Sequence, residues 1–275
     1  MATVIRFSPG RLKTPLGRVG AALERSAGLF TIFPVRASTA DTLVPGDGVG
    51  ALLWLPLLGA VLGAAAGLPD VAIRQWAPHA GPLGAVLSIG ALAVMTRCLH
   101  LDGLADTTDG LASRAPAERA LEIMRKSDIG PFGVVAIVFA VLVDVVALSG
   151  VPGGAWTPVP ILAVAAATGR VAAVQAAMRG VPAARSSGFG ALVAGGVPAG
   201  AVAAWTVGVL VFGTLAAQSA SVPVIGLVVV QCCALAAGWL LRMHAVRRLG
   251  GTTGDVFGAL IELVTAVSLA GMVLS

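Results

Sequence analysis

Charged side chains are scarce in this sequence, and tyrosine is absent. Only 11% of the 275 residues are charged, whereas soluble domains carry about 25%. Hydrophobic residues make up 57% of the chain, and the mean hydropathy is +0.94. This composition excludes an ordinary soluble domain and indicates an integral membrane protein. The net charge of +5 does not indicate nucleic-acid binding, because the basic residues lie between apolar stretches.

Cysteine is scarce as well. Cys98, Cys232 and Cys233 form no CxxC pair and have no metal-binding spacing, which argues against a zinc or disulfide framework. The first 28 residues contain no continuous apolar core, so no cleavable signal peptide is evident. We expect residues 1–28 to be a basic cytoplasmic leader and residues 29–275 to be a single integral membrane domain.

Long apolar stretches, in contrast, are abundant. Seven of them approach the roughly 20 residues that a helix needs to cross a bilayer. They predict an all-α fold, a polytopic membrane helical bundle of about seven transmembrane helices. A shorter apolar stretch at 29–36 predicts an interfacial or re-entrant segment, and residues 114–130 predict a cytoplasmic amphipathic helix. The predicted spans are 49–68, 82–98, 131–149, 158–178, 198–217, 222–241 and 256–274.

Basic residues are distributed asymmetrically among the connections. With the N-terminus in the cytoplasm, 16 of the 18 Lys and Arg residues fall in cytoplasmic segments, which is the usual bias of membrane proteins. The other two are Arg74, which shares a short polar loop with Asp70 between the first two spans, and Arg170, which lies within the fourth span. This pattern predicts seven spans with the N-terminus inside and the C-terminus outside.

Three carboxylates lie within eight residues at the cytoplasmic end of the second span. Asp102, Asp106 and Asp109 are spaced i, i+4 and i+7, so on a helix they share one face. Like charges at this spacing repel each other, which favours a bound cation. Hard oxygen ligands of this kind suit Mg²⁺ held together with substrate phosphates.

A second acidic group opens the last span. Asp255 and Glu262 are spaced i, i+7 on one helix face, and Glu262 falls inside an apolar helix. A carboxylate is costly at such a position, which makes it a functional candidate. The preceding Gly-rich turn from Gly250 to Gly254 either brings backbone N–H groups to a phosphate or is an ordinary loop.

Two cations and an acid precede the third span. Arg125, Lys126 and Asp128 form either a phosphate-binding set or a solvated cluster at the membrane surface. Together with the two acidic groups they collect at one membrane face. This arrangement suggests phosphoryl chemistry on a membrane-associated substrate, with divalent cations screening a diphosphate.

Three further polar residues need an explanation. Arg170 either pairs with a membrane carboxylate such as Glu262 or reaches a phosphate. His100, beside the acidic stretch, is a general base, a phosphate contact or a helix-end histidine satisfied by the backbone. The predicted topology places Asp144 toward the outer half of the third span, away from the site, where we expect it to be a structural partner to a polar group.

Residues 99–110 resemble the signature HLDGLADTxDG of cobalamin synthases, the adenosylcobinamide-GDP ribazoletransferase family. Other stretches resemble that family's motifs in the same order. These are FTRIPV at 30–35, WFPxxG at 54–59, EIMRDSRxG at 122–130 and GGxTGDxxGAxxE ending at Glu262. At residues 126–128 the chain has Lys-Ser-Asp where the family has Asp-Ser-Arg, so the acid and the base have exchanged places.

The resemblance implies a Mg²⁺-dependent phosphotransferase of the bacterial cytoplasmic (inner) membrane, with residues 29–275 as its catalytic domain. It implies transfer of the adenosylcobinamide phosphate of adenosylcobinamide-GDP to α-ribazole or α-ribazole 5′-phosphate. GMP leaves, and adenosylcobalamin or its 5′-phosphate forms, which completes the nucleotide loop of coenzyme B12. The active site would face the cytoplasm.

The resemblance also implies roles for the candidate residues. Five carboxylates would hold one or two Mg²⁺ on the diphosphate: Asp102, Asp106, Asp109, Asp255 and Glu262. Positive side chains would stabilise the charge of the diphosphate: Arg125, Lys126 or Arg170. Asp109, which we favour, or His100 would take the proton of the ribazole hydroxyl. The remaining binding residues would be Gly251, Thr253, Gly254 and Asp128.

Two other functions compete with this one. A CDP-alcohol phosphotransferase that makes phospholipid has an Ala-Arg pair after its first Asp-Gly and wider aspartate spacing, both absent here. A transporter would use Asp144, Arg170 and Glu262 as an ion path, but most acids cluster at one face and no internal repeat is evident. The predicted partners are the two substrates and the lipid bilayer, without nucleic acid, and a homo-oligomer stays open. We expect residues 179–197 to form part of the corrinoid-docking surface.

Overall fold

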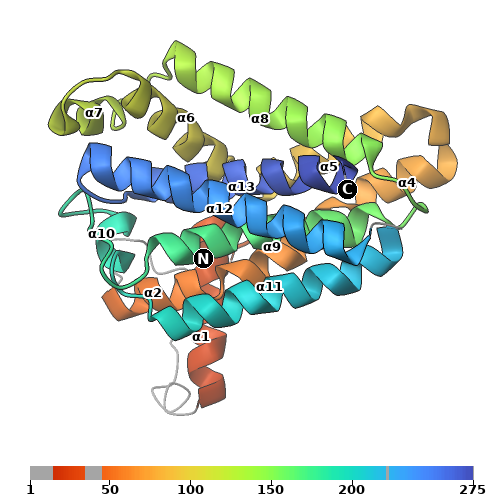
Figure 1. The fold of residues 1–275 in the computed structure, drawn as a ribbon, viewed down its shortest axis with the longest axis horizontal. Coiled ribbons are helices and arrows are strands. Elements are labelled where there is room, and N and C mark those ends of the chain that lie inside the picture. Colours follow the sequence, from red (N-terminus) through yellow and green to blue (C-terminus); the bar gives the residue numbers. More distant parts are fainter. Residues whose placement is uncertain (1–14, 35–44, 221–222, 275) are drawn as a thin grey trace, which may run out of the picture.

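The computed structural model describes residues 15–34, 45–220 and 223–274. Within these ranges the chain is helical and has no β-strand, only two isolated bridges (Figure 1). The all-α prediction is therefore confirmed. The helices are α1 (Pro15–Phe30), α2 (Pro45–Leu53), α3 (Leu55–Ala66), α4 (Leu68–Trp76), η3 (Pro78–Ala80), α5 (Gly81–Met95), α6 (Leu99–Ala112), α7 (Ala117–Ile123), α8 (Pro131–Gly150), α9 (Pro158–Ala176), α10 (Phe189–Val193), α11 (Ala199–Ala220), α12 (Val224–Leu249) and α13 (Gly254–Leu274).

Seven helices or helix pairs in the described residues are long and apolar enough to cross a membrane, which confirms the predicted number. The first differs from the prediction, because it runs from Leu55 to Trp76 through α3 and α4. The expected start of that span, residues 49–53, belongs to the separate helix α2, and the chain turns at Trp54. Five of the other spans lie within a few residues of the predicted ranges, whereas the sixth, predicted at 222–241, runs from Val224 to Leu249.

The polar loop expected around Asp70 and Arg74 is helix α4. Its two charges pair with each other, since Arg74 lies 3.2 Å from Asp70, and Arg74 also donates to the carbonyl oxygens of Leu148 and Val151 at 3.0 and 3.2 Å. The backbone N–H of Asp70 also donates to the Ser88 hydroxyl at 3.1 Å. The helix therefore continues through a sequence that reads as polar, and it ties α4 to the end of α8.

Helices α9 and α13 form the interior of the bundle, and Figure 1 shows them between α8 and α11. Most residues of α9 are buried, as are most of the α13 residues. The outer helices expose apolar side chains instead, among them Phe139 of α8, Val211 of α11 and Ile225 of α12. In a bilayer these side chains face lipid, so the exposed apolar surface is expected of a membrane protein.

Helix α3 packs on α9 through glycines spaced four residues apart. Gly59, Gly63 and Gly67 face the α9 backbone, and a Cβ added at Gly67 would lie 2.9 Å from the carbonyl oxygen of Pro158. Small residues at this spacing let two membrane helices approach closely. This contact explains part of the high glycine content of the sequence.

The N-terminal region differs in detail from the prediction. Helix α1 crosses the expected border at residue 28 and ends at Phe30. The stretch expected to be interfacial or re-entrant continues as a bend, in which the N–H of Ile32 donates to the carbonyl oxygen of Met95 at 2.9 Å. Several basic residues of the predicted leader and its extension lie outside the described residues: Arg6, Arg11, Lys13 and Arg36.

The cytoplasmic amphipathic helix is shorter than predicted. Of residues 114–130, only Ala117–Ile123 are helical, as α7, and turns follow as far as Gly130. Ala120 and Met124 are buried, so the apolar side of this segment packs on the bundle. The prediction was wrong about the length because residues 125–129 are all exposed and have no buried face to order a further turn.

Candidate active site

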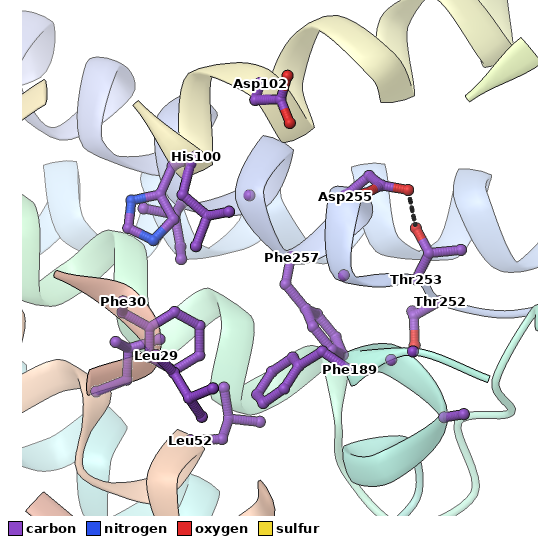
Figure 2. A pocket seen from close by; sticks show the side chains of 18 of the residues that line it. Leu29, Phe30, Leu52, His100, Asp102, Phe189, Thr252, Thr253, Asp255 and Phe257 are labelled. Carbon is purple, nitrogen blue, oxygen red and sulfur yellow. Dashed lines mark hydrogen bonds between the residues drawn. The ribbon is translucent and has the colours of Figure 1, made fainter. Parts of the chain in front are cut away.

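One end of the bundle contains a cavity of about 580 Å³, which we call the main cavity (Figure 2). Five segments enclose it: the end of α1, the end of α2 with the start of α3, the start of α6, the loop leading into α10, and the start of α13. These segments are far apart in the sequence. The connections predicted to be cytoplasmic supply three of them, so the cavity opens at the face where the sequence places the chemistry.

The crossing of α6 and α13 brings the two acidic groups together. A Cβ added at Gly103 would lie 2.7 Å from the carbonyl oxygen of Asp255, and one added at Gly258 would lie 3.1 Å from that of His100. Only glycine allows the two backbones to approach this closely. As a result Asp102 and Asp255, separated by 153 positions, line the same cavity.

Asp255 is held by two polar side chains. The guanidinium of Arg185 donates to its carboxylate at 3.0 Å, and the hydroxyl of Thr253 donates to the same oxygen at 3.2 Å. The Thr253 oxygen also accepts the N–H of Val256 at 3.2 Å, which caps the start of α13. A second nitrogen of Arg185 donates to the carbonyl oxygen of Leu121 at 3.0 Å, so this cation links α7 to the site.

The Gly-rich turn before α13 pairs with the loop that carries Arg185. The N–H of Thr252 donates to the carbonyl oxygen of Pro182 at 2.9 Å, and the N–H of Ala184 donates back to Thr252 at 3.0 Å. Gly251 packs directly on the backbone of this loop. Among the predicted binding residues, Thr253 and Gly254 therefore line the main cavity, whereas Gly251 holds the loop in place.

Electrostatic repulsion connects the four aspartates of this region. The pKa of the Asp106 carboxyl is raised to about 7, first by burial and then by the charges of Asp102 and Asp255. Asp109 adds to the rise, and the Arg185 guanidinium opposes it. In the part of the chain that the structure describes, no three acidic, His or Cys side chains form a ready-made metal centre. The site is thus a negatively charged group of separate carboxylates.

Asp109 has a structural contact that the sequence did not reveal. Its two carboxylate oxygens accept the backbone N–H groups of Gly130 and Gly133 at 2.7 and 2.9 Å. These two N–H groups belong to the first turn of α8, which has no internal partners for them. A Cβ added at either glycine would meet the Asp109 carboxylate. Asp109 therefore caps α8 from the neighbouring helix.

A second group of charges lies deeper, and we call Asp144, Arg170 and Glu262 the buried charge cluster. All three line a small separate cavity of about 20 Å³. Arg170 is fully buried and donates to the carbonyl oxygen of Ala166 at 3.0 Å. Asp144 does not line the main cavity, as expected, and α8 packs on α13 so that its charge is coupled to that of Glu262.

His100 separates the two sites. Its ring lines the main cavity, and its Nδ1 atom lies 3.9 Å from a carboxylate oxygen of Glu262. Burial lowers the pKa of His100 well below its usual range, and the Arg170 charge lowers it further, so the ring is neutral at pH 7. Glu262 itself does not line the main cavity. The structure therefore places Glu262 with Arg170, away from Asp102 and Asp255.

Comparison with known proteins identifies the chain. The family model described as cobalamin-5-phosphate synthase matches residues 23–273. The chain belongs to the cobalamin-5-phosphate synthase family. It is 39% identical over 260 residues to the adenosylcobinamide-GDP ribazoletransferase of Frankia casuarinae, covering 90% of this chain and 92% of that one. The protein of the same name from Shigella flexneri is 38% identical over 231 residues, or 80% and 86% of the two chains. No solved structure shows significant similarity.

The three predicted site residues that precede α8 lie away from the main cavity. Arg125, Lys126 and Asp128 are exposed on the turns between α7 and α8 and do not line it. They lie a few residues before Gly130, which contacts Asp109. The structure thus brings together Asp102, Asp106 and Asp255 but leaves the basic residues of this motif at the surface.

The sequence did not single out the cation that does reach the aspartates. Arg185 was counted only as a cytoplasmic charge of the connection 179–197. It stands in a stretch of small residues that also contains Arg179, and nothing in that stretch distinguishes the two cations. Sequence patterns also did not single out three aromatic residues, Phe30, Phe189 and Phe257. They are far apart in the sequence and contact one another only in the fold.

Proposed function

We propose that this chain acts as an adenosylcobinamide-GDP ribazoletransferase in the last steps of coenzyme B12 nucleotide-loop assembly. A hydroxyl oxygen of α-ribazole, or of α-ribazole 5′-phosphate, forms a bond to the phosphorus that carries the cobinamide. The phosphoanhydride bond breaks, GMP leaves, and adenosylcobalamin or its 5′-phosphate forms. Family membership supports this reaction, and so do the names of the curated relatives.

One structural observation carries the proposal. Asp102, Asp255 and Arg185 line a single cavity in which α6 and α13 cross. Carboxylates that face a cavity next to a cation are suited to a diphosphate substrate with a divalent metal, since most of the catalysis of phosphoryl transfer is positioning and charge stabilisation. The cavity lies at the end of the bundle, where a large water-soluble donor has access.

The donor set fits Mg²⁺. This ion prefers hard oxygen ligands and is held by one or two carboxylates together with substrate phosphates rather than by a complete protein cage. Asp102 and Asp255 would supply those oxygens. The charges of these two carboxylates also repel that of Asp106, and a bound divalent cation would reduce this repulsion. When bound, Mg²⁺ would neutralise the diphosphate and stabilise the leaving phosphate.

The chain's own residues would divide the remaining work. Arg185, already oriented by Asp255 and Leu121, would bind a phosphate oxygen as a charge-assisted donor. Asp106, whose carboxyl is electrostatically coupled to those of Asp102 and Asp255, would take the proton of the ribazole hydroxyl. Asp109 remains the competing base, although two backbone N–H groups already occupy its oxygens.

The other predicted residues keep narrower roles in this proposal. The exposed Arg125, Lys126 and Asp128 would contact the part of the donor that stays outside the cavity. The buried Arg170 and the nearby Glu262 would act by holding His100 rather than by touching substrate.

We also propose the orientation predicted from the sequence. The main cavity and the N-terminus would face the cytoplasm and the C-terminus the outside of a bacterial inner membrane. The support is the distribution of charge, since 16 of the 18 basic residues fall in the cytoplasmic segments of that topology. The donor carries a charged diphosphate and does not cross a bilayer unaided, so a cytoplasmic cavity is also the side from which it would arrive.

The buried charge cluster is the observation that favours a second function, an ion transporter. The test that separates the two uses the purified protein in liposomes. Release of GMP from adenosylcobinamide-GDP should require α-ribazole and protein together and should stop when EDTA removes Mg²⁺. Two results would reject the proposal: GMP release that does not depend on α-ribazole, or a proton flux without any GMP release. Glu118→Gln, which changes an exposed acid of α7, is the control variant.

A further inference from the structure

The main cavity has two chemically different sides. Figure 2 shows the carboxylates of Asp102 and Asp255 on one side, and Phe30, Phe189 and Phe257 on the other. We call these three rings the phenylalanine wall. The proposed chemistry uses the carboxylate side only. The apolar side therefore needs a function of its own.

Contacts between the three rings hold the phenylalanine wall together. The rings of Phe30 and Phe189 meet edge to face, with centroids 5.2 Å apart, and those of Phe189 and Phe257 do so at 6.3 Å. Each ring comes from a different helix, α1, α10 or α13. Helix α10 is held against the site because Gly190 packs on the backbone of Thr253. Edge-to-face contacts of this kind fix ring positions, and the Phe30 ring also stacks on His100, with centroids 6.5 Å apart.

The size of the cavity limits what reaches this wall. A cavity of about 580 Å³ lies in the range that encloses a drug-sized molecule. It accommodates a nucleoside but not the whole corrinoid of the donor. The candidates for the wall are therefore the base of the ribazole acceptor and the guanine of the donor.

We propose that the phenylalanine wall binds the dimethylbenzimidazole base of α-ribazole, an inference that rests on the proposed function. Guanine presents hydrogen-bond donors and acceptors along its edge, and a wall of phenylalanines would leave them unpaired at a cost in free energy. The dimethylbenzimidazole base has an almost entirely apolar outline and an aromatic face, which match the wall. A base held there leaves its ribose on the carboxylate side of the cavity.

The test separates the Michaelis constants of the two substrates. Phe189→Ala should raise the KM for α-ribazole about tenfold, because stacking on an aromatic ring contributes on this scale to base binding. The KM for adenosylcobinamide-GDP should stay within about twofold, since the wall does not touch the donor. Phe189→Tyr keeps the ring and should restore the KM for α-ribazole. Phe139→Ala, on the exposed side of α8, is the matched control and should change neither constant.

Each outcome decides the question. A rise in the KM for the donor alone would assign the wall to guanine, and no change in either KM would assign it to packing or lipid; both overturn the inference. Binding of free dimethylbenzimidazole, measured by calorimetry, should weaken about tenfold in Phe189→Ala. This measurement needs no turnover, so it still reports on the wall if the wild-type protein releases no GMP, a result that would reject the proposed function instead.

Discussion

The two charged regions of the molecule use the same residue types in opposite ways. Near the main cavity, the charges of Asp102, Asp106 and Asp255 repel one another, and Arg185 is the cation that pairs with Asp255. In the buried charge cluster, Asp144 and Glu262 share the environment of Arg170 around a cavity of about 20 Å³. The first region keeps an excess of negative charge and an opening, whereas the second is closed and nearly balanced.

Access to water explains this difference. Charges next to an open cavity are screened by water, so an excess of one sign is tolerated until a cation and a phosphate substrate bind. Inside the bundle an unpaired charge costs several kcal/mol, so each one must have a partner. We infer that the open region carries the chemistry and that the closed one carries stability. Four predictions test this comparison.

The largest effect is expected at the buried Arg170. Arg170→Leu would leave Glu262 and Asp144 without a cation and should lower the stability of the protein by about 3–5 kcal/mol. Thermal unfolding in detergent measures this loss. Arg119→Leu is the control, because its ion pair with Glu122 is exposed and should matter by less than about 1 kcal/mol.

A double variant sharpens this first prediction. Arg170→Leu combined with Glu262→Gln removes the stranded charge and should recover part of the lost stability. If Arg170→Leu unfolds at the temperature of the parent protein, the cluster does not carry stability, and the contrast between the two regions disappears.

The next largest effect is expected at the main cavity, where a substitution should lower activity rather than stability. Asp255→Asn removes a carboxylate from the group proposed to hold Mg²⁺ and loosens Arg185, so GMP release should fall about 100-fold. Stability should change by less than about 1 kcal/mol, because the neighbouring aspartates repel this charge. Initial rates at saturating substrate, together with unfolding temperatures, measure both quantities. A stability loss as large as that of Arg170→Leu would contradict the comparison.

A smaller effect on stability is expected at Asp109. Asp109→Asn retains one carbonyl oxygen and so loses one of the two N–H contacts at the start of α8, at a cost of about 1 kcal/mol. If Asp109 is a cap and not the base, GMP release should fall less than in Asp106→Asn. Rates of the two variants, measured side by side, decide between them. Near-complete loss of activity in Asp109→Asn alone would restore Asp109 as the base.

The smallest effect concerns pH. The pKa of Asp106 is about 7 in the folded protein, above the ordinary value of 3.8, so the folded state binds more protons than the unfolded chain between these values. Stability of the metal-free protein should therefore fall as pH rises from about 4 to 7, by about 1 kcal/mol or less, since the carboxyl is partly exposed. Unfolding temperatures across this range measure it, and the slope should flatten in Asp106→Asn. If stability falls with pH equally steeply in Asp106→Asn, a group other than Asp106 causes the pH dependence.

Much of the architecture follows from local patterns. The apolar stretches predicted seven spans, and the spacing of Asp102, Asp106 and Asp109 predicted one helix face, because each depends only on residues a few positions apart. The prediction failed at α4, where Asp70 and Arg74 read as a polar loop. The two side chains pair with each other within α4, and Arg74 also donates to carbonyl oxygens at the end of α8, a contact that a local pattern does not contain.

The candidate site divides in the same way. The sequence by itself determined the family motifs, the seven apolar spans and the acidic residues at one membrane face. Only the tertiary structure decided that α6 and α13 cross at Gly103 and Gly258, that Arg185 meets Asp255, and that three phenylalanines from separate helices form one wall. The physical reason is range: helical periodicity is set within a few residues, whereas the partner of each helix face depends on close packing between segments far apart in the chain.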